Sequence, residues 1–438
     1  MTSLFSKRRE FLKNFGISLS YLFLSNLFFQ KRLKAKNKPK VVIIGFGIGG
    51  ATCLKYLKNF SDEIEIIIVE SKKKIKTCPF SNLVIGNILK YDDIVFDIDK
   101  RMYDGVKFIY ENVDFIDSEK KIIKLSGNLI INFDYLIISP GISYKDNIKG
   151  YDPLNKKVVP HCWDGSGDLL DFKKRIDDLD DNAKIIISAP DYPYRCPPAP
   201  YERASLISNY LKKKKKKHKI LILDSKDSFT KQENFFHEWN LNFKDTIEWI
   251  PREKGGKVVY FDSKNYLVKN EVGEVFKGDF IHIIPEQKTA SLIFNSRLID
   301  EKSDWCQINP VTFELIGQKD IHILGDSIDA GDMPKSAFSA NSQAKILATN
   351  LINKIFGRKF IEPVFLNTCY SFATESRAFS ISSWYRLNKD KDRIVSLGSL
   401  QSEKDASPED RIEEVKQAYG WYETMVHSLF LGVRNFNN

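Results

Sequence analysis

Six cysteines give this chain its widest choice of chemistry, because a thiolate can act as a nucleophile, bind a metal or form a disulfide. Cys78, Cys196 and Cys369 lie in segments that are expected to be loops. The other three are expected to be buried small hydrophobic side chains: Cys53, Cys162 and Cys306. The three loop cysteines are therefore the candidates for reactive groups.

The spacing of the cysteines argues against several kinds of site. The sequence holds no C-x-x-C and no cysteine–histidine cluster with zinc spacing, so no metal site is expected. It also lacks C-x-x-C-H, so the chain is not expected to attach a c-type haem itself. Disulfides between distant cysteines are compatible with an exported protein, but spacing alone does not select the pair.

A second chemical motif lies near the N-terminus, where glycines follow an apolar run. Residues 40–44 are expected to form a buried parallel strand, 51–60 a helix and 65–69 a second strand. The turn between the first strand and the helix reads G-x-G-x-x-G, which is typical of a βαβ unit that binds a dinucleotide.

The residues of this motif have separate expected roles. Gly45 permits the tight turn, Gly47 lets the backbone approach a pyrophosphate, and Gly50 lets the helix pack on the strand. The N-terminus of the helix offers free N–H groups and a positive dipole to the phosphates. Glu70 follows the second strand, 25 residues after Gly45, and is expected to bind a ribose hydroxyl.

Further apolar strands divide the chain into domains. Segments 135–141 and 321–326 are expected to contain strands, and Gly325 with Asp326 suits a second contact with the ribityl-phosphate region of FAD. The pattern predicts an α/β fold with two Rossmann-like domains, in which the second interrupts a discontinuous FAD-binding domain. The expected boundaries are 37–150 and 291–360 for the FAD-binding domain, 151–290 for the inserted domain, and 361–438 for a C-terminal α+β interface domain.

The inserted domain lacks a glycine fingerprint. Its strands are expected at 183–188 and 219–224 and its helix at 201–213. The intervening segment 189–200 contains five prolines and no glycine, and prolines remove the backbone donors that a phosphate cradle needs. We therefore predict that this domain does not bind NAD(P)H.

The last region is aromatic. From residue 361 the sequence predicts an irregular, aromatic segment that ends in a partly amphipathic helix at 412–431, lying near the flavin.

The net charge of +10 is concentrated at one end of the chain. Residues 1–40 hold ten of the 67 basic residues and one of the 57 acidic residues, so the remainder carries only about +1 and gives no indication of a nucleic-acid partner. Arg8 and Arg9 precede an apolar stretch at 15–29, which is typical of a twin-arginine export signal. We expect residues 1–36 to direct the protein to the periplasm or, if uncleaved, to hold it peripherally at an anionic membrane.

Long motifs resemble the flavin-binding subunit of flavocytochrome c sulfide dehydrogenase. The resemblance spans nearly the whole chain and rests on the export signal, on the glycine-rich segment 41–52 and on the segments 77–86, 195–205, 325–326, 333–336, 339–343 and 367–371. Generic disulfide reductases share only the glycine segments.

The resemblance implies a function and its groups. It implies that Cys78 carries FAD through an 8α-thioether and that Cys196 and Cys369 form a redox-active disulfide beside the flavin. The protein would then be a sulfide:cytochrome-c oxidoreductase that converts hydrogen sulfide to sulfur or polysulfide. Its partner would be a c-type cytochrome subunit in a heterodimer.

Two further side chains are candidates for the same site. Glu202 lies six residues after Cys196 and is a candidate acid or base, although an acid favoured by a helix N-terminus is an equal interpretation. Lys335 is a candidate to stabilise negative charge at the N1 and C2=O side of the reduced flavin, although it is equally compatible with a surface lysine.

Three other functions share much of this pattern. A sulfide:quinone reductase has the same architecture but delivers electrons to membrane quinone. An accessory flavoprotein of a thiosulfate-oxidising complex would share the site residues. An NAD(P)H-linked disulfide reductase is disfavoured by the proline-rich segment.

Overall fold

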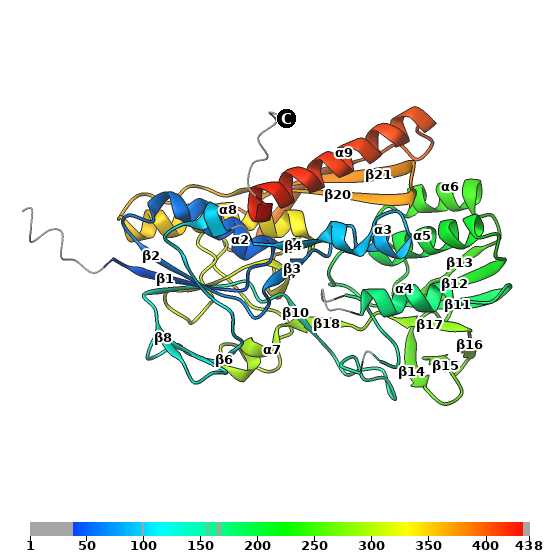
Figure 1. Cartoon of the computed structure of the whole chain (residues 1–438), viewed down its shortest axis with the longest axis horizontal. Helices are drawn as coiled ribbons and strands as arrows, with labels where there is room; N and C mark the ends of the chain where they lie inside the picture. The colour runs from blue at the N-terminus through cyan, green and yellow to red at the C-terminus, as the bar shows by residue number, and fades with distance from the viewer. Residues whose placement is uncertain (1–37, 99, 156, 164–167, 432–438) are drawn as a thin grey trace, which may run out of the picture. The chain divides into compact units, whose positions relative to one another are not determined.

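The computed structural model describes residues 38–98, 100–155, 157–163 and 168–431 (Figure 1). The predicted export segment 1–36 therefore lies outside the described residues. None of the described helices is both long and apolar enough to span a bilayer.

The first sheet is parallel and brings distant parts of the chain together. Its strand order is β19-β9-β1-β2-β5. The strands are β1 (Lys40–Ile44), β2 (Glu65–Val69), β5 (Lys107–Ile109), β9 (Tyr135–Ile138) and β19 (Ile321–Ile323). The valines and isoleucines of β1, β2, β9 and β19 are almost fully buried because both faces of the sheet are covered, whereas the edge strand β5 is only partly buried.

The two faces of this sheet are covered differently. Figure 1 shows helices α2 (Ile48–Leu57) and α8 (Ala337–Ile355) on one side and an antiparallel sheet on the other. The three strands of that sheet are β6 (Val113–Asp117), β7 (Ile122–Leu125) and β8 (Ile130–Asn132). The predicted helix 51–60 begins earlier than expected, at Ile48, and its last turn is the separate 3₁₀ helix η1 (Lys58–Phe60).

A second parallel sheet is built from the middle of the chain, in the order β13-β12-β11-β17. The strands are β11 (Ala183–Ala189), β12 (His218–Asp224), β13 (Ile247–Ile250) and β17 (Phe280–Ile283). The helices of this part are α4 (Leu169–Asp177), α5 (Ala199–Lys213) and α6 (Gln232–Asn242). Its antiparallel sheet consists of β14 (Val258–Asp262), β15 (Leu267–Asn270) and β16 (Val275–Lys277). Because β19 returns to the first sheet after this second sheet is complete, the α/β fold with an inserted Rossmann-like unit is confirmed.

The two segments that connect the first sheet to the inserted unit lie side by side. Strand β10 (Ile142–Tyr144) pairs antiparallel with β18 (Gln287–Thr289) and forms a two-stranded connection. The remaining short elements of the first two regions are β3 (Lys74–Lys76), β4 (Val95–Asp97), α3 (Ser81–Ile85), α7 (Ser291–Asn295), η2 (Tyr91–Ile94), η3 (Lys100–Tyr103), η4 (Arg252–Lys254) and η5 (Gly325–Ser327).

The C-terminal region is more regular than the sequence predicted. The expectation of an irregular segment from residue 361 was wrong, because β20 (Val364–Thr374), β21 (Arg377–Leu387) and β22 (Ile394–Gln401) form an antiparallel sheet. In the first half of β20, buried residues alternate with exposed ones, which is the signature of a strand with one covered face. The predicted last helix is seen as α9 (Pro408–Val426) followed by one π-helical turn, η6 (His427–Leu431).

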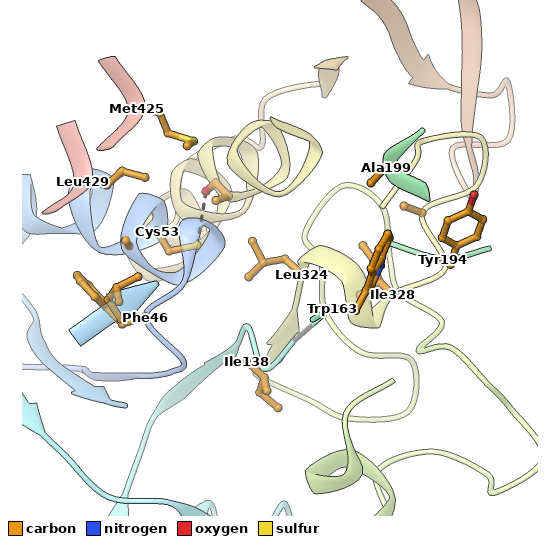
Figure 2. Close-up of a cluster of buried hydrophobic side chains, with 14 of the residues drawn as sticks. Phe46, Cys53, Ile138, Trp163, Tyr194, Ala199, Leu324, Ile328, Met425 and Leu429 are labelled. Carbon is orange, nitrogen blue, oxygen red and sulfur yellow. Dashed lines mark hydrogen bonds between the residues drawn. The ribbon is translucent and has the colours of Figure 1, made fainter. Parts of the chain in front are cut away.

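One hydrophobic cluster joins these parts. It runs from Phe46 and Cys53 through Leu324 to Trp163 and Tyr194 (Figure 2). The Cys53 thiol donates a hydrogen bond to the Ala344 carbonyl at 3.7 Å, and burial raises its pKa. As predicted, Cys53 is a core residue.

A buried group of charges ties α6 to the C-terminal region. The carboxylate of Glu238 is 0% exposed and accepts two hydrogen bonds from Arg377, at 2.6 and 2.9 Å. It also lies 3.3 Å from the fully buried Arg411 of α9. Buried ions are tolerated only when they are paired, so these three side chains depend on one another.

We predict that Glu238→Ala lowers the free energy of unfolding by about 3–5 kcal/mol, because two guanidinium groups lose their shared carboxylate in a dry environment. The measurement is urea unfolding of the wild-type and variant proteins. The matched control is Glu248→Ala, which removes an exposed ion pair with Lys219 and should cost less than about 1 kcal/mol. Equal losses in the two variants would contradict the assigned role of Glu238.

Candidate functional site

A single pocket collects most of the predicted site residues. It is lined by the loop after β1, the end of β2, the segment around Cys78, the loop before α5, the start of α8 and strand β20. The predicted residues in its wall are Gly45, Gly47, Glu70, Cys78, Cys196, Glu202, Gly325, Asp326 and Cys369. Gly50 and Lys335 are not in the wall.

The glycine loop has the geometry that a dinucleotide requires. Gly45 has φ +88°, and a Cβ there would lie 2.4 Å from the Ser139 carbonyl oxygen. A Cβ on Gly50 would lie 1.9 Å from the Gly45 carbonyl oxygen, so close packing of helix on strand needs glycine. Gly47 has nothing within 4 Å of its Cβ position, which leaves its backbone open to the pocket.

Glu70 is fixed by the backbone of the same loops. One carboxylate oxygen accepts a hydrogen bond from the Phe46 N–H at 2.7 Å, and the other accepts from the Lys72 N–H at 2.9 Å. An ionised carboxylate has about four lone-pair positions, so Glu70 keeps the capacity to accept a ribose hydroxyl.

Asp326 presents an unsatisfied acceptor to the pocket. Its Oδ2 accepts from Arg195 Nε at 2.6 Å, whereas its Oδ1 is buried without a hydrogen-bond partner among the described residues. A buried carboxylate oxygen without a partner is costly, and a hydroxyl of a bound molecule would satisfy it. The residues present therefore fit FAD, whose ribityl chain carries such hydroxyls.

Cys78 lies on the wall of this pocket beside a guanidinium group. Arg195 Nη1 is 3.6 Å from the Cys78 Sγ and 3.0 Å from the Trp163 carbonyl oxygen. Burial works against the charge of Arg195, but the carboxylate of Asp326 raises its pKa above the ordinary value, so the group is a permanent cation. The Cys78 loop is also tied to α9, since Thr77 Oγ1 and the Tyr422 hydroxyl lie 2.6 Å apart.

Cys196 and Cys369 face the same pocket from different regions. Cys196 precedes α5 and has φ +56°, a left-handed conformation that is rare for a residue with a side chain, while Cys369 lies in β20. Both are free thiols in this structure and lie in the wall of the same pocket. Burial raises the pKa of both thiols.

Glu202 is a partly buried acid rather than an exposed helix-terminal one. It lies in the first turn of α5, and its two oxygens accept from Asn82 Nδ2 at 2.6 Å and from the Phe372 N–H at 2.9 Å. Burial raises its pKa, although these two donors oppose the shift. A carboxyl group with a raised pKa beside two thiols is suited to exchange a proton with sulfur.

Lys335 is placed differently from both interpretations of the sequence. It is buried, and its Nζ donates to the carbonyl oxygens of Asp326, at 3.0 Å, and Ile328, at 2.6 Å. The ammonium also lies over the Trp305 ring, and burial lowers its pKa to about 8. Lys335 therefore stabilises the loop that contains Asp326, because its ammonium donates hydrogen bonds to the backbone of that loop. The side chain is not part of the pocket wall.

Several residues of the site were missed by the sequence analysis. Arg195 and Arg203 flank the Cys196 loop, and their closeness to a candidate cysteine was the only available signal. Arg203 is buried between Asn82 Oδ1, at 2.9 Å, and the His161 carbonyl oxygen, at 3.0 Å. Cys162, expected to be a simple core residue, is buried but also lines the pocket.

The inserted unit uses its own residues where a nucleotide ribose would bind. Asp224, which ends β12, is fully buried and accepts hydrogen bonds from the Tyr201 hydroxyl, at 2.5 Å, and Trp249 Nε1, at 2.8 Å. Lys226 Nζ lies 2.5 Å from the same carboxylate and close to the Tyr194 ring. These contacts support the prediction that this unit does not bind NAD(P)H.

Comparison with protein families gives three matches that together cover most of the chain. Residues 169–285 match "sulfide dehydrogenase (flavocytochrome c) flavoprotein chain, central", and residues 361–430 match "flavocytochrome c sulphide dehydrogenase, flavin-binding". Residues 39–176 match the pyridine nucleotide-disulphide oxidoreductases. The flavin-binding matches support FAD as the cofactor.

Individual proteins show the same relationship. The chain is 47% identical over 45 residues to the sulfide dehydrogenase (flavocytochrome c) flavoprotein chain of Chlorobaculum thiosulfatiphilum, covering 10% of this chain and 94% of that one. It is 26% identical over 344 residues to the mitochondrial sulfide:quinone oxidoreductase of Dictyostelium discoideum, covering 75% and 74% of the two chains.

Solved structures share the fold. The sulfide:quinone oxidoreductase of Aquifex aeolicus superimposes with a TM-score of 0.65 at 15% identity, covering 90% of this chain and 96% of that one. An NAD-dependent persulfide reductase of A. fulgidus gives 0.59 at 15% identity, covering 87% and 76%.

We predict that Gly47→Ala folds normally but loses flavin. The new methyl group meets no protein atom within 4 Å, so it enters the space into which the pocket opens. The dissociation constant for FAD, measured with apoprotein before any covalent link forms, should rise at least about tenfold, which corresponds to about 1.4 kcal/mol of lost binding. Gly420→Ala is the control, because that glycine also has open space but is not in the pocket wall. An unchanged FAD affinity in Gly47→Ala would place the cofactor elsewhere.

Proposed function

Because the chain belongs to the flavoprotein family of flavocytochrome c sulfide dehydrogenase, we propose a function in sulfide oxidation. In this proposal the protein transfers electrons from sulfide to a c-type cytochrome in the periplasm. The observation that carries the proposal is the meeting of two free thiols and the partly buried carboxyl group of Glu202 in the pocket of the glycine loop. We further propose that Cys78 holds the FAD covalently and that a cytochrome subunit is the partner.

The thiol pair would oxidise sulfide by disulfide exchange. Hydrosulfide attacks one sulfur of the Cys196–Cys369 disulfide, the S–S bond breaks, and the products are a persulfide on one cysteine and a thiolate on the other. A second hydrosulfide then attacks the outer persulfide sulfur, which releases hydrodisulfide and leaves two thiol groups. When these groups return to the disulfide they give up two electrons. FAD, when bound, would accept this electron pair and pass the electrons on singly.

The other residues of the pocket support these steps. Glu202 would take up and return the protons of the sulfur species, because burial raises its pKa and so favours the protonated form more than in an exposed glutamate. Gly45, Gly47, Glu70 and Asp326 would hold the dinucleotide.

A sulfide:quinone reductase is the second candidate. The relative from Dictyostelium discoideum, which covers three quarters of this chain, favours it. The outer face of the C-terminal sheet also exposes Leu366, Trp384 and Leu400, the last with 69% of its surface accessible. An apolar surface of this kind is compatible with contact to a membrane that contains quinone.

The electron acceptor separates the two candidates. We predict that sulfide bleaches the flavin absorbance under anaerobic conditions and that the reduced protein then reduces a c-type cytochrome at least about tenfold faster than a soluble quinone analogue. The measurement is stopped-flow absorbance of flavin and haem. The reverse preference would identify a sulfide:quinone reductase, and absence of bleaching would contradict sulfide oxidation. Bleaching by NADH would indicate a pyridine-nucleotide-linked reductase.

Covalent attachment is tested separately. We predict that acid precipitation leaves the yellow colour on the wild-type protein but releases it from Cys78→Ala, because the 8α-thioether needs that sulfur. Cys306→Ala is the matched control, since Cys306 is fully buried beside Thr289 and does not line the pocket. Mass spectrometry of the peptide that contains Cys78 gives the same answer directly. Release of all flavin from the wild type would contradict the proposed link.

A further inference from the structure

Lys231 is a buried lysine next to the cysteine pair. It lies between β12 and α6, has φ +65° and is only 3% exposed. Its Nζ donates to the backbone carbonyl oxygens of Cys369, at 2.8 Å, and Phe379, at 3.5 Å. The side chain therefore crosses from the inserted unit to strands β20 and β21 and ends behind Cys369, outside the wall of the pocket.

The charge of this ammonium group is not neutralised by a carboxylate. Within the described part of the chain, no Asp or Glu oxygen lies within 4.0 Å of Lys231 Nζ. Carbonyl dipoles and the nearby Phe379 ring satisfy it only in part. Burial lowers the pKa of Lys231, and nearby groups that can carry negative charge oppose that shift, so the ammonium form of this side chain depends on negative charge in its surroundings.

Four groups that can carry negative charge act electrostatically on Lys231. They are Cys369 of β20, Cys196 before α5, Glu202 of α5 and Glu414 of α9. Glu202 is already bound by Asn82 and the Phe372 N–H, and Glu414 pairs with Arg411 at 3.2 Å. By contrast, the causes that shift the pKa of Cys196 and of Cys369 include no hydrogen bond from a charged side chain to either sulfur.

We propose that Lys231 is a positioning residue that stabilises anionic sulfur at the Cys196–Cys369 pair, with its main effect at Cys369. The proposal deepens the proposed function, because it concerns the same two thiols, but it does not depend on the electron acceptor. Lys231 touches the backbone of Cys369 rather than a reacting sulfur, so it acts through the electrostatic field at the thiols.

The expected effect on ionisation follows from the surrounding charges. Burial raises the pKa of Cys369 and the carboxylate of Glu202 raises it further, whereas the ammonium of Lys231 lowers it. Cys196 experiences the same opposing groups together with the neighbouring thiol. Removing the ammonium should therefore shift both thiolates to higher pH, and Cys369 more than Cys196.

The experiment measures thiol alkylation in the flavin-loaded protein without sulfide. Wild type and Lys231→Met are reduced with dithiothreitol, freed of it anaerobically and treated with iodoacetamide between about pH 6 and 10, the range in which thiols ionise. Peptide mass spectrometry then gives the rates for Cys369 and Cys196. We expect iodoacetamide to alkylate Cys369 at least about tenfold more slowly in Lys231→Met than in the wild type at pH 7. The pH at which the rate rises should be higher by about one unit in the variant. An unchanged profile would overturn the proposal.

Two further variants separate charge from packing. Lys231→Arg keeps the charge and should restore most of the wild-type profile; if it behaves like Lys231→Met, charge is not the cause and the proposal is wrong. Lys226→Met removes another buried lysine of the same loop, one that pairs with Asp224 and contacts no cysteine. It should leave the thiol profile unchanged, and an equal shift there would also overturn the proposal.

The proposed function and the proposed role of Lys231 can be tested independently of each other. If sulfide does not reduce the flavin of the wild type but the alkylation profile shifts as described, the proposed function is wrong and the role of Lys231 stands. If sulfide reduces the flavin and the profile does not shift, only the role of Lys231 is wrong.

Discussion

The ion pair between Arg195 and Asp326 holds the site together. Its two side chains are 16% and 13% exposed and approach to 2.6 Å, so each would be a costly isolated charge without the other. Arg195 comes from the inserted unit, Asp326 from the returning part of the FAD-binding unit, and the same guanidinium reaches Cys78 in the first part of the chain. Because a guanidinium is a rigid fork of donors, this one group fixes three distant segments in a single geometry.

Similar buried charges occur wherever the inserted unit meets another part of the chain. Glu238 of α6 joins Arg377 and Arg411 of the C-terminal region, and Lys231 reaches the carbonyl oxygens of β20 and β21. Apolar contacts alone would allow the packed units to shift relative to each other. Charged hydrogen bonds are directional, so they favour one arrangement of the units. The proposed disulfide between a cysteine of the insert and a cysteine of β20 would need such a fixed arrangement, since a disulfide tolerates little change in the distance between sulfurs.

The sequence predicted best those features that depend only on neighbouring residues in the chain. The glycine loop, the buried strands β1, β2, β9 and β19 and the order of the inserted unit follow from apolar runs and from glycines whose Cβ positions are sterically blocked. The C-terminal sheet was missed because its aromatic strands alternate only in part. Lys231 had no signal at all: it lies 35 residues from Cys196 and 138 from Cys369, and only the packing of α6 on β20 brings it to the thiols. The contacts of Lys335 could not be predicted either, because the sequence does not indicate whether a lysine side chain binds a ligand or a backbone carbonyl.

The proline-rich segment affects both the backbone donors of the inserted unit and the course of the chain at the pocket. In a nucleotide-binding unit, glycines at this place turn the backbone N–H groups toward phosphate. Here five prolines remove those donors and hold the chain in a different course, which places Arg195 beside Asp326 and Cys196 in a left-handed conformation facing the pocket. Asp224 ends β12, where a nucleotide-binding unit presents an acid to the ribose, and here it forms an ion pair with Lys226. The sheet of the inserted unit carries α5 and α6, and with them Glu202 and the segment ending in Lys231. In the proposed function, this scaffold positions residues of the thiol site.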